Sequence, residues 1–153
     1  MNEEELSLKN YKMPLERKQI YIIDNDASVL RSLKILMDTY GFDVDTFTSS
    51  DKFFEAVTKR AIGCLILDVH LVGLDGWDTQ QKLKKNGYTL PVIVISADKS
   101  SSFKDKALKA GAVGYLQKPF EDHHLFHLVT LAFKNTKEEI LNQSILDPKT
   151  IIP

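Results

Sequence analysis

Four polar residues stand at the ends of apolar runs in this sequence, and together they could bind a metal ion and a phosphoryl group. They are, in chain order, Asp24, Asp68, Ser96 and Lys118. Two neighbouring carboxylates favour a divalent cation such as Mg2+, which takes one or two carboxylates together with water and phosphate oxygens. A lysine in the same pocket supplies a positive charge for a phosphoryl group. Taken singly, each of these residue types is also common in loops and helix caps.

Five short runs rich in β-forming residues are the strands that would bring these side chains together. Four are apolar, at 19–23, 64–67, 92–95 and 113–116, and a weaker, alternating run spans 42–47. Three of them are almost continuously apolar, which is typical of strands covered on both faces. Because the carboxyl ends of parallel strands share one edge of a sheet, we expect the four polar side chains to converge there.

Segments with helical spacing lie between and after these runs. They are expected at 26–40, 50–59, 77–86, 102–110 and 121–135. Asp26 is a candidate N-cap for the first helix. The apolar stripe of that helix is expected to be Val29, Leu33, Leu36 and Tyr40. Five β-α units in succession predict an α/β fold, a doubly wound five-stranded parallel sheet with helices on both faces. The pattern does not determine the strand order.

The composition argues against several classes of protein. Twenty basic and 21 acidic residues nearly cancel, so we expect neither direct nucleic-acid binding nor attraction to a membrane surface. The acidic N-terminus is unlike a secretory signal, and no apolar run approaches the roughly 18 residues of a membrane helix. We therefore expect a cytoplasmic protein without membrane insertion. The single cysteine, Cys64, lies within an apolar run and is expected to be a core residue.

The joint pattern resembles the receiver domain of two-component response regulators. The matching segments, in the order of the chain, are IIDND (22–26), LILDVHLVGLDG (65–76), VIVISA (92–97) and GYLQKPF (114–120). The resemblance covers residues 18–135 and implies a flavodoxin-like sheet with strand order 2-1-3-4-5. It leaves an N-terminal extension at 1–17 and a C-terminal extension, or the start of a linker, at 136–153.

The resemblance implies a phosphoacceptor function for this chain. Asp68 would attack the phosphohistidine of a histidine kinase or a histidine phosphotransfer protein and form an aspartyl phosphate. Lys118 would pair first with the Asp68 carboxylate and then with the phosphoryl oxygens. The Lys118–Pro119 peptide bond is expected to be cis, as in the family. The implied Mg2+ ligands are the side chains of Asp24, Asn25 and Asp68 and the backbone carbonyl of His70.

The resemblance also implies a switch. Ser96 would turn its hydroxyl toward the phosphoryl group, and Tyr115 would change rotamer as the space behind Ser96 closes. The surface that responds would consist of the fourth helix, the fifth strand and the fifth helix. Its partner would be a downstream protein or a second copy of the chain.

Two positions depart from the family pattern. Asn25 stands where a second acidic residue usually ligates Mg2+, and Val72 stands where proline is often found. An asparagine oxygen can still coordinate, but the site loses one formal negative charge and is expected to hold Mg2+ less well. Val72 is expected to loosen the loop without affecting the chemistry.

Two alternative functions stay open at this point. The motif DND (24–26) resembles the nucleophile motif of haloacid-dehalogenase-type phosphatases, with Asp24 as the nucleophile, but that reading leaves Asp68 without a role. The second alternative is a pseudo-receiver, a binding module that works without phosphorylation, for which Asn25 is the argument. About 18 residues remain after the fifth helix, too few for a helix-turn-helix output domain. We therefore expect either a stand-alone receiver or a fragment of a longer regulator.

Three histidines gather near the start of the fifth helix, at 123, 124 and 127. His123 and His127 have the i, i+4 spacing of some metal ligands, but no glutamate follows the first histidine as in HExxH. We therefore expect surface residues here rather than a metal site. His70 is expected to be a loop residue, and Trp77 an anchor at the start of the third helix.

Overall fold

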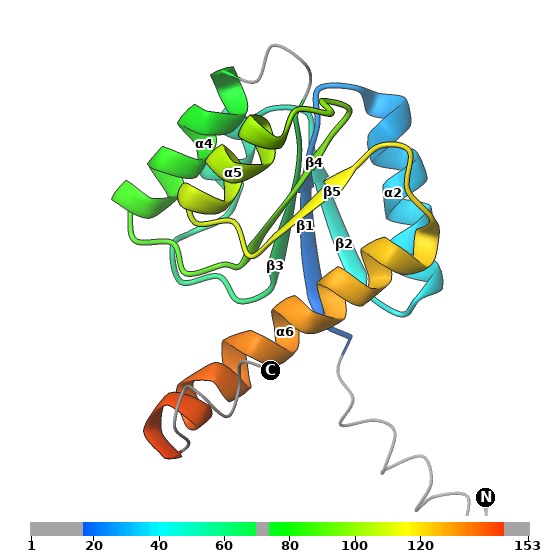
Figure 1. Cartoon of the computed structure of the whole chain (residues 1–153). Coiled ribbons are helices and arrows are strands. Elements are labelled where there is room, and N and C mark those ends of the chain that lie inside the picture. Colours follow the sequence, from blue (N-terminus) through cyan, green and yellow to red (C-terminus); the bar gives the residue numbers. More distant parts are fainter. Residues whose placement is uncertain (1–16, 70–73, 146–153) are drawn as a thin grey trace, which may run out of the picture.

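Five parallel strands form one sheet in the computed structural model, and helices cover both of its faces (Figure 1). The strand order is β2-β1-β3-β4-β5, as the resemblance implies. The structure describes residues 17–69 and 74–145. The strands are β1 (Gln19–Ile23), β2 (Asp43–Phe47), β3 (Cys64–Val69), β4 (Val92–Ser96) and β5 (Gly114–Gln117). The predicted fold class is therefore confirmed, and the strand bounds differ from the predicted ones by at most two residues.

The helices follow the strands in the predicted alternation. They are α2 (Ala27–Thr39), α3 (Ser50–Ala56), α4 (Leu74–Lys85), α5 (Ser101–Lys109) and α6 (Asp122–Ile145). The predicted N-cap of α2 is confirmed, because the Asp26 carboxylate accepts hydrogen bonds from the backbone N–H groups of Ser28 and Val29. Within the described ranges, no helix is long and apolar enough to cross a membrane.

The start of α4 differs from the prediction. The helix begins at Leu74 rather than at Trp77, so Gly76 lies inside it and is not part of the preceding loop. A Cβ atom at position 76 would overlap Cγ1 of Val69, so glycine allows α4 to approach β3 closely. The sequence pattern missed this because a glycine that serves helix packing looks like a loop glycine.

The ends of α3 and α6 also differ from the prediction. α3 stops at Ala56, because the next residue, Val57, adopts an extended backbone with φ −120° and ψ 118°. α6 continues to Ile145, past its predicted end at Asn135. No glycine or proline interrupts the sequence from residue 121 until Pro148, so nothing in the chain stops the helix at 135.

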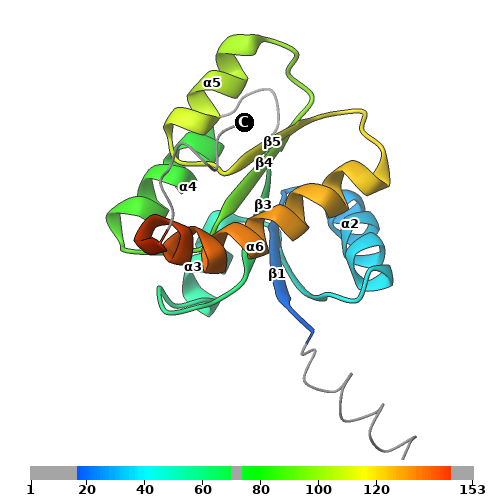
Figure 2. The ribbon, with the colours of Figure 1, turned by 60° about the horizontal axis from the view of Figure 1, so that its bottom comes forward.

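The sheet separates two apolar cores. Helices α2 and α6 cover one face, and Figure 2 shows α6 crossing the strands beside α2. Helices α3, α4 and α5 contribute to the core of the other face. Every residue of β3 and β4 is buried, as the continuous apolar runs predict. Cys64 is fully buried, and burial raises the pKa of its thiol to about 12, which agrees with the predicted core role.

The buried stripe of α2 is shifted from the predicted one. The buried side chains are Leu30, Leu33 and Met37. Val29 and Leu36 are only partly buried, and Tyr40 lies after the helix and stacks on Phe126 of α6. The stripe follows the side of α2 that packs into the core shared with the sheet and α6, and the spacing within α2 cannot reveal which side that is.

Candidate functional site

Two carboxylates meet at the carboxyl edge of the sheet. β1 and β3 are neighbours, and Ile23 pairs with Leu67, so the next residues along the two strands, Asp24 and Asp68, lie opposite one another. Both are buried, with 1% and 5% of their surface exposed. The backbone N–H of Asp26 donates to Oδ1 of Asp24 over 2.9 Å, which joins that carboxylate to the start of α2. The convergence expected from the sequence is therefore present.

A lysine reaches the same edge from β5. Nζ of Lys118 lies 2.8 Å from Oδ2 of Asp68, whose side chain is fully buried while that of the lysine is 29% exposed. The backbone N–H of Lys118 donates to the carbonyl of Ser96 over 2.8 Å, which fixes the lysine beside the end of β4. The Lys118–Pro119 bond is cis, as expected. The ammonium group thus offsets one of the two buried negative charges.

Burial makes the Asp68 carboxylate costly. The pKa of Asp68 is raised to about 6, chiefly by burial and in part by the nearby Asp24 charge, while Lys118 acts in the opposite direction. Opposite charges at a short distance favour ionisation, so the lysine limits the penalty without removing it. A second cation at this edge would stabilise the ionised form.

The structure offers donor atoms for such a cation. Oδ1 of Asp68 is buried and accepts no hydrogen bond from the residues that the structure describes. Two carboxylates against one ammonium group leave a net negative charge among these three side chains. Oxygen donors with this charge fit a hard divalent ion such as Mg2+. Asp24 and Asp68 are the residues positioned to hold it.

Of the other two expected metal ligands, the structure describes Asn25 but not His70. Asn25 directly follows Asp24 and is exposed at the start of the loop before α2. Its side chain can therefore reach solvent beside the two carboxylates. His70 lies outside the described residues, as does Val72, so the expected carbonyl ligand and the altered loop stay predictions.

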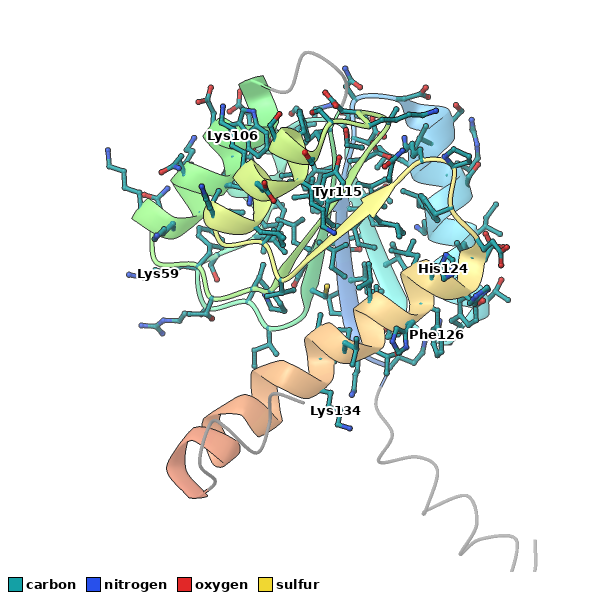
Figure 3. All side chains as sticks on the ribbon, in the orientation of Figure 1. Lys59, Lys106, Tyr115, His124, Phe126 and Lys134 are labelled. Carbon is teal, nitrogen blue, oxygen red and sulfur yellow. The ribbon has the colours of Figure 1, made fainter. Side chains whose placement is uncertain are left out.

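The two expected switch residues meet at a backbone segment between β4 and α5. Ser96 is fully buried, and its Oγ accepts a hydrogen bond of 3.0 Å from the N–H of Asp98. The hydroxyl of Tyr115, labelled on β5 in Figure 3, donates to the carbonyl of Asp98 over 3.0 Å. Asp98 therefore links the two residues. The sequence does not reveal this role of Asp98, because the link uses only its backbone N–H and carbonyl, which every residue type except proline has.

The remaining residues singled out from the sequence lie elsewhere. Trp77 is inside α4, where its ring packs 4.8 Å from that of Phe103 on α5 and lies beneath Nζ of Lys106 at 4.9 Å. It is a packing residue, as predicted, although it does not begin its helix. His127 is exposed on α6. The histidines that come together with an acidic residue are His123 and His124, not His123 and His127.

A parallel sheet of this order, with buried carboxylates and a lysine at its carboxyl edge, defines a flavodoxin-like domain of the receiver class. Residues 20–130 match the family described as response regulator receiver domain, and the chain belongs to this family. It is therefore a signalling domain. The family relationship favours neither the dehalogenase-type phosphatase nor the pseudo-receiver.

Several known proteins are similar to this chain. The response regulator protein TodT of Pseudomonas putida is 38% identical over 123 residues, which cover 80% of this chain and 54% of TodT. Full-length FixJ from B. japonicum superposes with a TM-score of 0.74 at 31% identity, covering 83% of this chain and 63% of FixJ. A response regulator receiver protein from Burkholderia phymatum gives a TM-score of 0.66 at 35% identity, covering 77% of this chain and 96% of that protein.

The first of these relatives is considerably longer than the match. The chain spans about half the length of TodT, 54%, so the similarity concerns the receiver domain alone.

Proposed function

We propose that this receiver domain accepts a phosphoryl group on Asp68 in a Mg2+-dependent reaction. The observation that carries the proposal is the buried Asp68 carboxylate, opposite Asp24 and 2.8 Å from Nζ of Lys118. An oxygen of Asp68 forms a bond to phosphorus while the bond from phosphorus to the donor nitrogen breaks. The electron pair of that broken bond stays on the donor imidazole, and the product is an aspartyl phosphate.

The neighbouring side chains lower the charge that builds up during transfer. Lys118 already contacts Asp68 and can follow the phosphoryl oxygens as they arrive. Mg2+, when bound, would supply positive charge that offsets the negative charge of the carboxylates and the phosphoryl group. Asp24 and Asp68 would hold it, together with Asn25 and the His70 carbonyl. Only the ionised carboxylate is nucleophilic, so cations that counter the raised pKa of Asp68 favour its reactive form.

Phosphorylation would then reach the surface through Asp98. If Ser96 turns its hydroxyl to the phosphoryl group, its Oγ leaves the N–H of Asp98, which breaks the 3.0 Å bond between them. Tyr115 is bonded to the carbonyl of the same residue, so its position changes with the loop. The surface of α5, β5 and α6 would report this change to a downstream protein or to a second copy of the chain.

The phosphodonor would be a histidine kinase or a histidine phosphotransfer protein. A groove lies on α2 and the loop after β5, close along the chain to Lys118, and can receive such a partner. It is lined by Ser32, Leu33, Ile35, Leu36, Thr39, Pro119, Phe120 and Asp122. Ile35 within it is 63% exposed, an apolar side chain available for contact.

Family membership also supports two statements about the setting of this domain. We assign it to the cytoplasm, where response regulators usually work. We also keep residues 18–135 as the domain, with 1–17 and 136–153 as extensions, since the family match at 20–130 lies within those limits.

Intact-mass analysis after incubation with acetyl phosphate and Mg2+ tests the proposed chemistry. We expect the mass of one phosphoryl group to be added, to be lost on treatment with hydroxylamine, and to be absent in Asp68→Asn. An added phosphoryl mass that persists in Asp68→Asn but disappears in Asp24→Asn would favour the phosphatase chemistry instead. A chain that takes no label and binds no phosphoryl mimic with Mg2+, yet still binds its partner, would be a pseudo-receiver.

A further inference from the structure

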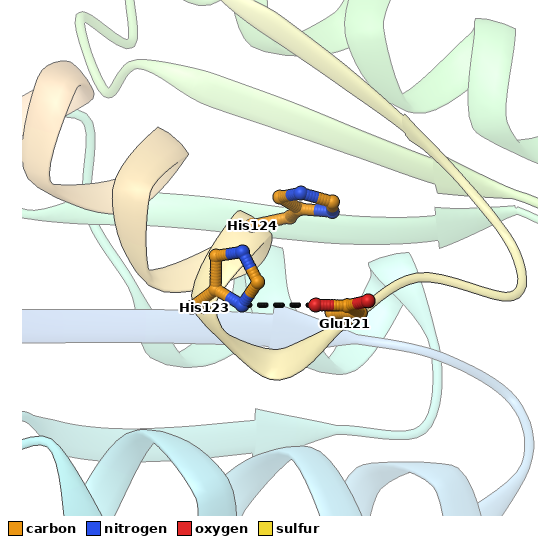
Figure 4. Close-up of side chains that lie close together, drawn as sticks. All are labelled: Glu121, His123 and His124. Carbon is orange, nitrogen blue, oxygen red and sulfur yellow. Dashed lines mark ion pairs between the residues drawn. The ribbon is translucent and has the colours of Figure 1, made fainter.

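Three side chains that can bind a metal ion come together at the start of α6 (Figure 4). Glu121, His123 and His124 each offer one donor atom, and these atoms all lie within 4.8 Å of one another. Nδ1 of His123 is 3.2 Å from Oε2 of Glu121, and the centroids of the two imidazole rings are 4.4 Å apart. The spacing in the sequence pointed to His123 and His127, but the fold joins His123 to its neighbour and to the glutamate before the helix.

We propose that Glu121, His123 and His124 form a surface site for a first-row transition-metal ion, with Zn2+ as the representative. Imidazole nitrogen together with a carboxylate suits Zn2+, Cu2+ and Ni2+. With bonds of roughly 2.0–2.1 Å, two ligands of a tetrahedral Zn2+ lie about 3.4 Å apart. The Nδ1–Oε2 distance of 3.2 Å is already close to this value. Only the third donor has to move inward, by rotation of an exposed side chain.

The backbone holds the three residues in one turn. The N–H of His124 donates to the carbonyl of Glu121 over 2.9 Å, so the chain positions of the three ligands are set before any ion arrives. Two consecutive histidines and the residue before the helix start thus face the same volume. An ordered turn lowers the entropy that binding would otherwise cost.

The competing interactions at this site are weak. The side chains of His123 and Glu121 are 64% and 73% exposed, and solvent weakens a contact between exposed groups, so a metal ion that replaces this contact gives up little. The positive end of the α6 dipole opposes a cation weakly at an exposed position. The carboxylates of Glu121 and of the exposed Asp122 beside it act against this effect.

This site is distinct in chemistry from the pair of carboxylates at the sheet edge. Mg2+ prefers oxygen donors and is matched by Asp24 and Asp68, whereas two imidazoles select a softer ion. An excess of Mg2+ should therefore not fill the histidine site, whereas it competes for the carboxylate pair. This difference makes a selective titration possible.

Calorimetric titration of the full chain with ZnCl2, purified without a histidine tag and in excess Mg2+, tests the proposal. We expect one Zn2+ per chain. His123→Gln and His124→Gln should each lower the affinity about tenfold or more, since even a residue that only supports a ligand typically contributes about 10- to 100-fold. His127→Gln is the matched control and should leave the affinity unchanged. All three residues are exposed, so far-ultraviolet circular dichroism should show the same fold for every variant.

Several outcomes would overturn the assignment. The first is the absence of Zn2+ binding, and the second is an unchanged Zn2+ affinity in both His123→Gln and His124→Gln. The third is loss of Zn2+ binding in His127→Gln, which would identify the i, i+4 pair, His123 and His127, as the ligands instead. Zn2+ binding that disappears in Asp68→Asn would place the ion at the sheet edge and equally contradict the proposal.

Discussion

At the scale of single residues, Asp68 is a carboxylate whose burial opposes its ionisation. Burial raises its pKa from 3.8 to about 6, so the folded state binds this proton more tightly than the unfolded chain does. The direction of the pH dependence of stability follows from this difference in proton affinity. The contribution of Asp68 to stability is greatest below pH 3.8, falls as the pH rises toward 6, and stays low above that value. A carboxylate kept ionised in this buried position therefore costs the protein stability.

We predict that Asp68→Asn stabilises the protein at neutral pH in Mg2+-free buffer. The amide carries no charge, so the free energy of unfolding should rise by about 1–3 kcal/mol at roughly pH 7.5, given about 1.4 kcal/mol per pKa unit. The gain should shrink as the pH falls toward about 5. Urea unfolding at both pH values measures it. Asp105→Asn, at an exposed position on α5, is the control and should show no such trend. A gain that grows on acidification would contradict the account.

Asn25 is the second residue whose chemistry can be tested directly. Asn25→Asp would give the edge three formal negative charges from residues 24, 25 and 68. We predict that Mg2+ binding tightens by up to about tenfold, or about 1.4 kcal/mol, since solvent screens most of the added attraction at an exposed position. The rate of phosphorylation at limiting Mg2+ should rise as well. Calorimetric titration with Mg2+ measures the affinity.

Asn86→Asp supplies the control for that experiment. It makes the same change of charge at an exposed position after the C-terminal end of α4 and should leave Mg2+ affinity unchanged. Equal affinity in Asn25→Asp and the wild type would mean that residue 25 does not reach the metal.

At the scale of elements, the contact between α4 and β3 depends on Gly76. The site of an added Cβ is occupied by Cγ1 of Val69, a buried β-branched side chain that has little freedom to move. We predict that Gly76→Ala lowers the free energy of unfolding by about 1–3 kcal/mol, the usual cost of overpacking. The loss should occur although alanine is otherwise a better helix former than glycine.

A double-mutant cycle identifies the cause of that loss. Val69→Ala removes the overlapping methyl group, so Gly76→Ala should cost much less in that background, and the two changes should be non-additive. Urea unfolding of the four proteins gives the coupling free energy. Additive effects would show that the two side chains do not meet, and that α4 lies farther from β3.

At the scale of the whole molecule, the proposed phosphorylation site and the proposed output surface are joined through Ser96, Asp98 and Tyr115. The two hydrogen bonds to the backbone of Asp98 are the described contacts that connect the buried hydroxyl to β5. We predict that binding of beryllofluoride with Mg2+ changes amide hydrogen exchange across residues 96–127. Asp68→Asn, treated in the same way, should show no change. Changes confined to residues 42–60, around β2 and α3, would place the output surface elsewhere.

The sequence alone determined the fold class and the main components of the site. Continuous apolar runs separated by helical spacing have few alternatives to a parallel sheet covered on both faces. Polar residues at the ends of such runs must share one edge, so the convergence of Asp24, Asp68, Ser96 and Lys118 followed from periodicity alone. The residue types and spacing also carried the resemblance to receiver domains. These features are local or repeat along the chain, and a linear pattern can express them.

Only the tertiary structure decided which atoms meet. The register between β1 and β3 sets Asp24 opposite Asp68, and the close approach of α4 to β3 explains Gly76. The role of Asp98 depends on backbone groups, which are the same in every residue type. The joining of Glu121 to His123 and His124 depends on where α6 begins and how its first turn is bonded. These contacts arise from packing and hydrogen bonding in three dimensions, and spacing along the chain does not encode them.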